Sequence, residues 1–259
     1  MARSRGFQAM EWLMHRRVMR RWGQMARAAE WADLSELRRQ RSNARALRQS
    51  LDQLVHVADS RLALPRVGST SFPRPAGTDW AWRPMLWRGP LGIKGLAGVE
   101  SQTRIGDEVT VFHDCRVSEL TLRQLRNDRE EDLAAFGLRL DVFRFDGSFL
   151  SLVIDLPPEA CEGLKKRHLL RVDMAVETEK PLEIFARLNV RHGPNVEQIV
   201  REVPQDGSRG LNIEFDLAYS KLNEKRVEKI WLDLIFEGPE MNQITLRDLT
   251  FARYPRAEL

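Results

Sequence analysis

Five polar and aromatic residues in the C-terminal half alternate along two predicted strands in a pattern suited to ligand binding. Phe185, Arg187 and Asn189 occupy every second position of "LEIFARLNVRH", and Trp231 and Asp233 do so in "KIWLDLIFE". Side chains two residues apart on a strand point to the same face. An aromatic ring can stack on the apolar side of a sugar while amides and charges take its hydroxyls, so these five are candidate glycan-binding residues. The competing interpretation is an ordinary outer sheet face with one large residue covered by a loop.

Acidic residues on the predicted strands allow a second chemistry, glycoside hydrolysis. Two carboxylates that flank a glycosidic bond can act as acid and base, and their separation in space decides whether they do so. Glu214 and Asp216 are predicted to share the wetter sheet face with the candidates above. The strand carboxylates are Asp141, Asp155, Asp173, Glu214, Asp216 and Asp233. Spacing in the sequence selects no pair among them, and a solvated sheet face accounts for most of them.

A third candidate region is a tryptophan cluster, "GTDWAWRPMLWRGPLG", at residues 77–92. Trp80 and Trp82 project to the same side of an extended segment, and Trp87 follows a proline and a turn. The cluster has two interpretations, an exposed ligand platform and a collar that covers an edge or end of the core. Because the cluster lies where the chain enters its folded domain, packing is the favoured interpretation, and the three tryptophans remain candidate ligand contacts.

Other chemistry-bearing motifs are weak. His113 and Cys115 in "FHDC" share a strand face, but parallel neighbours rarely form a nucleophile–base contact, so a structural role is expected. The sequence has no Walker lysine loop, no G-x-S-x-G, no HExxH and no metal-ligand spacing. We therefore predict no catalytic constellation, no metal and no cofactor.

The N-terminal region is strongly basic. Residues 1–66 contain fourteen arginines, no lysine and six acidic residues, a balance of +8 within a chain whose net charge is +4. Arg16, Arg17, Arg20 and Arg27 lie mostly off the apolar stripe of the first predicted helix. Such a face could bind an anionic membrane surface or nucleic acid phosphates, its apolar side could dock in a partner's groove, or the arginines could be solvated on a helical hairpin.

Composition bounds the class of protein and its compartment. The 259 residues are 42% apolar, enough for a substantial core, yet no apolar run is long enough to span a membrane. The basic N-terminus lacks the apolar region of a signal peptide. With no export signal, the two cysteines, Cys115 and Cys161, are expected to be reduced thiols. These features predict a cytoplasmic protein, peripheral to the membrane if its basic helix binds lipid.

Two predicted helices precede a linker. Apolar residues spaced by three or four predict a helix up to about residue 32, and "DLSE" at 33–36 predicts the start of a second helix that ends near residue 60. Leu37, Ala44, Leu47, Leu51, Leu54 and Ala58 fit heptad a and d positions, with Gln40 as a polar exception. We divide the chain into a basic helical region (1–64), a Pro/Gly/Trp-rich linker and collar (65–98), and a β domain (99–259).

After residue 105 the hydrophobic period changes from 3.6 to 2. Nine or ten strands with one apolar face each, and no alternation with helices, predict an antiparallel jelly-roll β-sandwich. Asp146-Gly147 predicts a two-residue hairpin. A one-residue slip of the apolar set in "ITLRDLTFARY" predicts a β-bulge near Arg247-Asp248. The stretch "SELTLRQLRNDREEDL" is ambiguous between strand and helix.

The segments "SFLSLVIDLP" and "NQITLRDLTFARYPRAEL" resemble an uncharacterised bacterial family of unknown function. Over roughly residues 77–259 the chain is also similar in general shape to jelly-roll carbohydrate-binding modules. These motifs are structural, so the resemblance implies a sandwich fold and glycan binding but assigns no functional residue.

Together these features predict a non-enzymatic binding or structural module. The sandwich would recognise a glycan or a partner surface, and the basic helical N-terminus would tether or oligomerise it. In the second case the chain would form a homo-oligomer. Two alternatives stay open: a glycoside- or polysaccharide-modifying enzyme on the same fold, with two strand carboxylates, and an adaptor bound to membrane or nucleic acid through its N-terminus.

Overall fold

The structure is a computed structural model that describes residues 2–62, 71–204 and 210–256. The chain divides into two compact units, Met1–Asp52 and Gln53–Leu259. The boundary falls inside the second long helix. We describe each unit by itself.

The N-terminal elements are two helices, as the apolar spacing predicts. Helix α1 spans Ala2–Ala28, a 3-10 turn follows at Ala29–Trp31, and helix α2 spans Leu34–Leu62. The amide of Leu37 donates to the carbonyl of Asp33 at 2.9 Å, which opens α2 where the sequence places its start. None of the described helices is long and apolar enough to cross a membrane.

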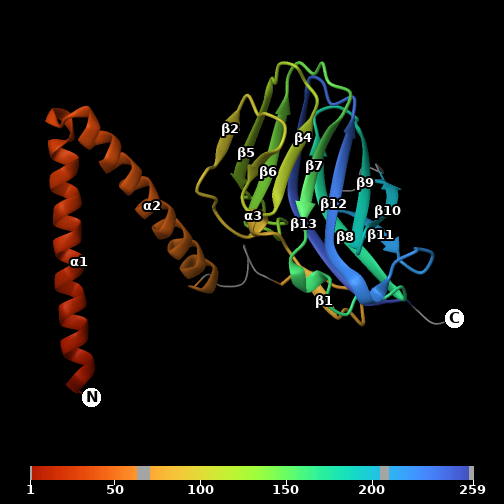
Figure 1. The fold of residues 1–259 in the computed structure, drawn as a ribbon, viewed down its shortest axis with the longest axis horizontal. Coiled ribbons are helices and arrows are strands. Elements are labelled where there is room, and N and C mark those ends of the chain that lie inside the picture. Colours follow the sequence, from red (N-terminus) through yellow and green to blue (C-terminus); the bar gives the residue numbers. More distant parts are fainter. Residues whose placement is uncertain (1, 63–70, 205–209, 257–259) are drawn as a thin grey trace. The chain divides into compact units, whose positions relative to one another are not determined.

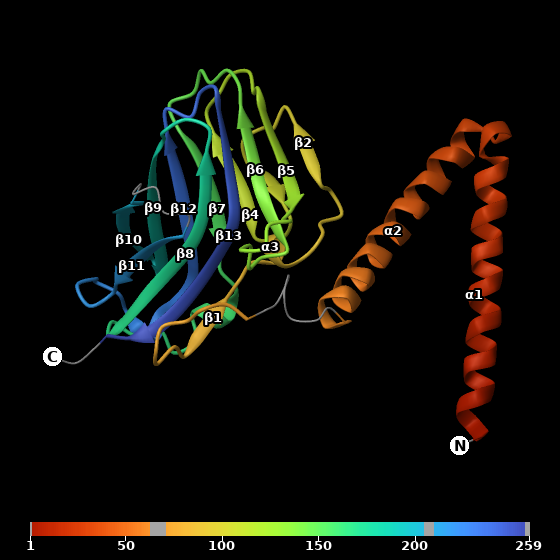
Figure 2. The same ribbon diagram turned by 180° about the vertical axis from the view of Figure 1, so that it is seen from behind.

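The remaining described residues form a sandwich of two antiparallel sheets (Figure 1). Sheet A, nearer the viewer in Figure 2, has the strand order β11-β8-β13-β6-β5-β2, and β1 also pairs with β13. Its strands are β1 Trp80–Trp82, β2 Gly95–Ala97, β5 Leu120–Arg126, β6 Phe136–Val142, β8 His168–Thr178, β11 Leu211–Asp216 and β13 Asn242–Pro255. A short helix, α3, spans Met85–Arg88 between β1 and β2.

Sheet B covers the other side of the core with the strand order β10-β9-β12-β7-β4-β3. Its strands are β3 Thr103–Ile105, β4 Val109–His113, β7 Leu150–Asp155, β9 Glu183–His192, β10 Asn195–Glu202 and β12 Val227–Glu237. Two 3-10 turns, Pro158–Ala160 and Glu224–Arg226, lie in the connecting loops. The predicted mainly β sandwich is confirmed, with thirteen strands in the described residues; β1, β2 and β3 have three residues each, too few for a periodic signal.

One apolar core fills the space between the sheets. The alternating residues of each strand enter it, for example Leu152 and Ile154 of β7 and Leu232 and Leu234 of β12, all fully buried. Because successive side chains of a strand alternate, this burial fixes which residues face outward. The face that sheet B turns away from the core therefore carries Ser151 and Val153 from β7, and its other residues follow from strand register.

Two local predictions have opposite outcomes. The β-bulge is confirmed, since the register of β13 against β8 shifts between Leu246 and Asp248. The hairpin at Asp146-Gly147 is wrong, because β6 belongs to sheet A and β7 to sheet B, so the loop crosses between sheets. A Cβ on Gly147 would lie 2.5 Å from Oδ1 of Asp114. The glycine is therefore needed because the side chain of Asp114 lies close to its backbone, and not because of a hairpin turn.

The ambiguous stretch after residue 117 is a strand followed by a loop. Strand β5 at Leu120–Arg126 buries Leu120 and Leu122 and pairs with β2 and β6. Tertiary pairing with sheet A, and not local propensity, decides its conformation.

Candidate functional site

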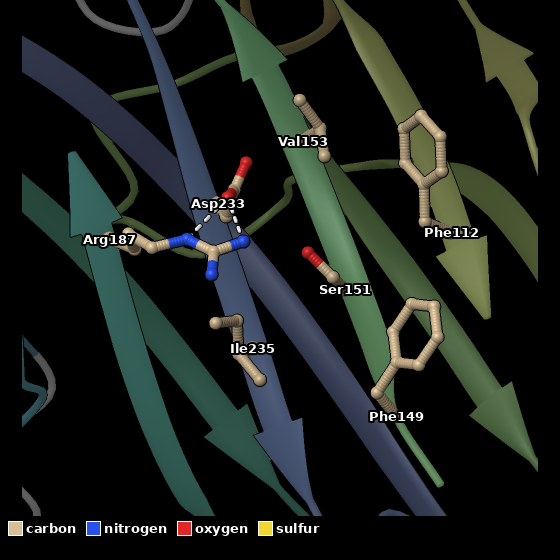
Figure 3. A pocket seen from close by; sticks show the side chains of 7 residues that line it. All are labelled: Phe112, Phe149, Ser151, Val153, Arg187, Asp233 and Ile235. Atoms are coloured by element: carbon tan, nitrogen blue, oxygen red, sulfur yellow. Dashed lines mark hydrogen bonds and ion pairs between the residues drawn. The ribbon is translucent and has the colours of Figure 1, made fainter. Parts of the chain in front are cut away.

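A pocket of about 370 Å³ opens on the outer face of sheet B (Figure 3). Its lining residues come from four neighbouring strands and the loop before β7: Phe112, Phe149, Ser151, Val153, Arg187, Asp233 and Ile235. Strand register brings them together, because Asp233 is paired with both Arg187 and Val153. Ser151 is paired with both Ile235 and Phe112 in the adjacent row.

An ion pair forms one side of the pocket. The guanidinium of Arg187 donates through Nε (2.8 Å) and Nη2 (2.6 Å) to Oδ2 of Asp233, and Nδ2 of Asn189 donates to the same oxygen at 3.1 Å. Gln198 in turn donates to Oδ1 of Asn189 at 2.9 Å. This network fixes the carboxylate of Asp233, which is only 3% exposed.

Two buried polar atoms of the pocket have no partner among the described residues. They are Oδ1 of Asp233 and Oγ of Ser151. A buried polar group without a hydrogen bond costs about 1–3 kcal/mol, so native structures rarely keep one without a reason. Three donors crowd Oδ2 of Asp233 while Oδ1 accepts none, and the two residues therefore offer hydrogen-bonding capacity that the described protein groups leave unused.

Aromatic and aliphatic side chains form the rest of the lining. The rings of Phe112 and Phe149 lie on the β4 and β7 side, across the pocket from Arg187 (Figure 3). Phe149 is 42% exposed and Phe112 is half-buried. Val153 and Ile235 supply further apolar surface. The pocket thus combines ring faces with a fixed carboxylate and a hydroxyl, and it can bind a ligand with both an apolar side and hydrogen-bond donors.

The five strand candidates all lie on this outer face. Trp231 is opposite Asn189, Asp233 is opposite Arg187, and Phe185 is opposite Ile235. Arg187 and Asp233 line the pocket. Asn189 is not among the lining residues, but its Nδ2 donates to Oδ2 of Asp233. The ring of Trp231 lies outside the lining, with Nζ of Lys229 5.5 Å from its centroid.

The six strand carboxylates do not lie on one sheet face. The expectation that Glu214 and Asp216 lie with Asp233 is wrong, because β11 pairs with β8 at the edge of sheet A. Asp141 and Asp173 also belong to sheet A. Asp155 is on sheet B but pairs with Nζ of Lys229 at 2.7 Å. Asp233 is the one carboxylate among the residues that line the pocket.

The tryptophan cluster lies away from the pocket. Trp87 is fully buried, and its Nε1 donates to the carbonyl of Leu246 at 3.0 Å, so no ligand can reach it and its role is packing. Trp80 and Trp82 are half-buried on β1 against β13 of sheet A, with ring centroids 6.5 Å apart. The ring of Trp82 lies 5.5 Å from that of Phe251 in the core.

The residues of "FHDC" have structural partners. Nδ1 of His113 accepts from the amide of Cys115 at 3.2 Å, so the proton on Nε2 bonds the carbonyl of Val99 at 2.8 Å. Burial raises the pKa of the Cys115 thiol and of the Cys161 thiol, which disfavours the reactive thiolate. Within the described ranges, no group of three or more potential ligands could hold a metal ion.

The basic candidates of α1 are all exposed. Arg16, Arg17, Arg20 and Arg27 contribute to an open charged surface, and the guanidinium of Arg16 lies 4.5 Å from the ring centroid of Trp12.

Sequence reasoning missed five of the seven lining residues: Phe112, Phe149, Ser151, Val153 and Ile235. A signal for them exists. Leu150, Leu152 and Ile154 alternate as core residues, which places Phe149, Ser151 and Val153 on the outer side. What the sequence lacks is the order of strands, which brings β7 and β4 beside β12.

Solved structures with a similar arrangement are mainly carbohydrate-binding modules. A family 11 carbohydrate-binding module from Clostridium thermocellum, in complex with a β-1,3-1,4-mixed-linked tetrasaccharide, aligns with 64% of this chain and 99% of its own at 11% identity and a TM-score of 0.39. The CBM22-1 xylan-binding domain from Paenibacillus barcinonensis aligns with 62% of this chain and 98% of its own, at 10% identity and a TM-score of 0.37. The enzymatically active domain of bacteriophage CBA120 tailspike protein 4 aligns with 64% of this chain but only 23% of its own, at 8% identity and a TM-score of 0.41.

Comparison at the level of sequence gives one family. No curated protein matches the chain significantly. The chain matches a family of unknown function, DUF6478, over residues 1–259, and it belongs to this family.

Proposed function

We propose that the β-sandwich of this member of the DUF6478 family is a non-enzymatic binding module that takes a glycan in the pocket on sheet B. One observation carries the proposal. Two buried polar atoms, Oδ1 of Asp233 and Oγ of Ser151, have no partner among the described groups and line a pocket with two phenylalanine rings. The ring of a sugar has hydroxyls that can bond the two oxygens and an apolar side that can contact the phenylalanine rings.

The chemistry of binding follows from the lining. Both atoms are buried, so lining side chains must shift before a sugar reaches them; one sugar hydroxyl then donates to Oδ1 of Asp233, and a second exchanges a hydrogen bond with Oγ of Ser151. The rings of Phe112 and Phe149 cover the apolar C–H side of the same sugar. Arg187 and Asn189 act as positioning residues, because they hold the carboxylate of Asp233 through its other oxygen.

Neighbouring residues of the same sheet face extend the site. Phe185 is opposite Ile235 of the lining, and Trp231 is opposite Asn189. We assign both aromatic residues to contacts with adjacent units of a longer glycan. For Trp231 this requires the side chain of Lys229, which lies over its ring, to move aside.

A hydrolase on this pocket is the second candidate, and the geometry disfavours it. Acid–base hydrolysis of a glycoside uses two carboxylates that flank the bond. Among the lining residues, Asp233 alone supplies a carboxylate, and Asp155 on the same sheet is paired with Lys229. Release of reducing ends from a bound polysaccharide would favour the enzyme and contradict a pure binding role.

The helical N-terminus is proposed to tether or oligomerise the sandwich. As a tether, the exposed arginines Arg16, Arg17, Arg20 and Arg27 would contact an anionic surface, either lipid headgroups or nucleic acid phosphates. Replacing all four by glutamate should abolish binding of the full chain to anionic vesicles or duplex DNA at low salt. If the wild-type chain binds neither polyanion at low salt, the tether is excluded.

The test of the glycan site is a glycan and polysaccharide array probed with the full chain. We expect binding to at least one ligand, and roughly tenfold weaker binding by the Phe149→Ala variant, which loses a ring face of the pocket. Phe143→Ala is the matched control, because Phe143 is similarly exposed (49%) but lies outside the pocket. Equal effects of the two substitutions, or no binding by the wild type, would sink the proposal.

A further inference from the structure

Helix α2 carries a seam with a seven-residue repeat. The seam positions alternate in spacing by three and four residues without interruption: Leu37, Gln40, Ala44, Leu47, Leu51, Leu54 and Ala58. A straight α-helix has 3.6 residues per turn, so a strict seven-residue repeat keeps a seam in register only where two helices supercoil around each other. The spacing thus indicates a helical partner with the same repeat.

The seam is uncovered along its second half. Leu47, Leu51 and Leu54 are 37%, 49% and 64% exposed, although they are the largest apolar side chains in the middle of α2. Burying a leucine stabilises a fold or an association relative to leaving it exposed to water. An assembly that covers three leucines in each copy therefore has a substantial driving force.

The width of the seam distinguishes a helical partner from a membrane. A helix that lies on a bilayer or on a core presents an apolar face about 100° wide or more, whereas a stripe confined to a and d positions is the seam of a coiled coil. At the e positions beside the seam, Arg41 and Arg48 are charged and exposed, whereas Val55 is apolar and 53% exposed, so the stripe is confined to a and d positions in the first two heptads of α2. We propose that α2 pairs with α2 of a second copy of this chain in a parallel, two-stranded coiled coil.

Charge supports the parallel orientation. With Leu37 at position a, Glu36 is at g and Arg41 is at the following e position, and a parallel pair places the g residue of one helix beside that e residue of the other. Glu36 of each copy then meets Arg41 of the other copy. Within its own helix Glu36 accepts from Nε2 of Gln40 at 2.9 Å and pairs with Nη2 of Arg39 at 2.7 Å, so Arg41 of the other copy shares a carboxylate that is already held beside the seam.

The seam residue Gln40 also favours this register. In a parallel, in-register pair its amide meets the identical amide of the second copy, and two amides can hydrogen-bond each other. A polar residue in an otherwise apolar seam favours the register that faces it with another polar residue, at some cost in stability. An antiparallel pair would face e positions with e positions and bring Arg41 close to Arg48, which is repulsive.

Sedimentation equilibrium of the full chain tests the dimer. We expect a mass twice the 30.0 kDa of the chain, and a monomer for the double variant Leu47→Glu/Leu51→Glu. The matched control, Ser42→Glu/Gln49→Glu, adds the same two charges at exposed positions outside the seam and should remain dimeric. A wild-type mass other than twice that of the chain, or equal effects of the two double variants, would overturn the proposal.

Charge exchange tests the orientation. Glu36→Arg should raise the dissociation constant of the dimer by about fivefold, since two attractive contacts become repulsive. Adding Arg41→Glu to the same chain restores opposite charges and should recover the wild-type value, whereas failure to recover contradicts the parallel register.

Vesicles of phosphatidylserine and phosphatidylcholine test the alternative that a membrane, and not a second copy of the chain, covers the seam of α2. If the seam joins two copies of the chain, Leu47→Glu/Leu51→Glu lowers the mass in solution from that of a dimer to that of a monomer, and this change does not depend on vesicles. Loss of vesicle binding with an unchanged mass in solution would assign the seam to lipid and overturn the dimer. None of these measurements depends on the glycan pocket.

Discussion

The outer faces of the two sheets are both rich in charged residues, yet they differ in how those charges are used. On sheet A the ionic groups pair with each other. Arg171 binds Asp173 at 2.7 Å, Arg139 binds Asp141 at 2.8 Å, and Arg247 binds Glu177 at 3.0 Å. These three acceptors are occupied by cations of the same face, and a further ligand would have to displace them.

Sheet B is organised differently around its pocket. Oδ1 of Asp233 and Oγ of Ser151 are buried and unused by the described groups, and exposed aromatic surface lies beside them. A count of polar residues would not separate the two faces. What separates the pocket on sheet B from the ion pairs of sheet A is whether the polar atoms are satisfied within the protein, since a satisfied network stabilises the fold and an unsatisfied one has capacity for a partner.

The largest predicted effect concerns stability on the side of sheet A. Arg83 is 3% exposed as a residue, and its guanidinium makes two hydrogen bonds, at 2.9 and 2.7 Å, to the carboxylate of Asp248 on β13. Arg83→Met leaves this half-buried carboxylate, which is 17% exposed, without its cation, so we expect a loss of about 3 kcal/mol in the free energy of unfolding, measured by denaturant titration.

A second variant separates charge from packing in this experiment. Arg83→Met/Asp248→Leu removes both charges and should recover much of the lost stability. If the single variant is as stable as the wild type, the ion pairs beside sheet A do not stabilise the fold, and the contrast between the two faces is lost.

A prediction of intermediate size concerns the affinity of the pocket on sheet B for its ligand. Ser151→Ala deletes a buried hydroxyl that bonds no described group, so the free energy of unfolding should stay within about 0.5 kcal/mol of wild type or rise. The affinity for the glycan found on the array should fall about tenfold, because one hydrogen bond to the ligand is lost. Calorimetric titration and thermal unfolding measure the two quantities. A stability loss with unchanged affinity would reverse the assignment of this face.

The smallest effect is a pH dependence on sheet A. Burial, together with the hydrogen bond from the Tyr254 hydroxyl to Glu214 at 2.6 Å, raises the pKa of Tyr254 to about 12. A raised pKa in the fold favours the protonated form, so this contribution to stability is complete below pH 10 and is lost as the pH rises through about 12. Tyr254→Phe should remove a high-pH step from the absorbance titration of the two tyrosines at 295 nm. If the step that disappears lies near pH 10, the ordinary range of a tyrosine, Tyr254 is not held in this contact.

The sequence predicts much of the fold because burial on one face of each strand imposes a period of two. That period gives the sandwich and the bulge between Leu246 and Asp248. It does not give strand order, and so it fails wherever sheet membership matters. Glu214 and Asp233 have the same local pattern but lie on different sheets. Asp146-Gly147 has the composition of a hairpin turn and instead joins the sheets.

The candidate site is only partly predictable for the same reason. Arg187 and Asp233 are identified from alternation and a polar character that a buried strand lacks. Phe112 and Ser151 are not, because what marks them is their position beside β12, and β4 and β7 reach that position through long-range pairing. An unsatisfied oxygen is likewise a property of the folded structure, since the residue types do not reveal which of two carboxylate oxygens is bonded.

The most direct test of the glycan site is a crystal structure of the full chain with an oligosaccharide identified on the array. We expect a sugar ring against Phe149 on sheet B, one hydroxyl within hydrogen-bond distance of Oδ1 of Asp233, and another within reach of Oγ of Ser151. The pair between Arg187 and Asp233 should be unchanged. A sugar bound on sheet A, or one on sheet B that leaves both polar atoms without a partner, would contradict the proposal.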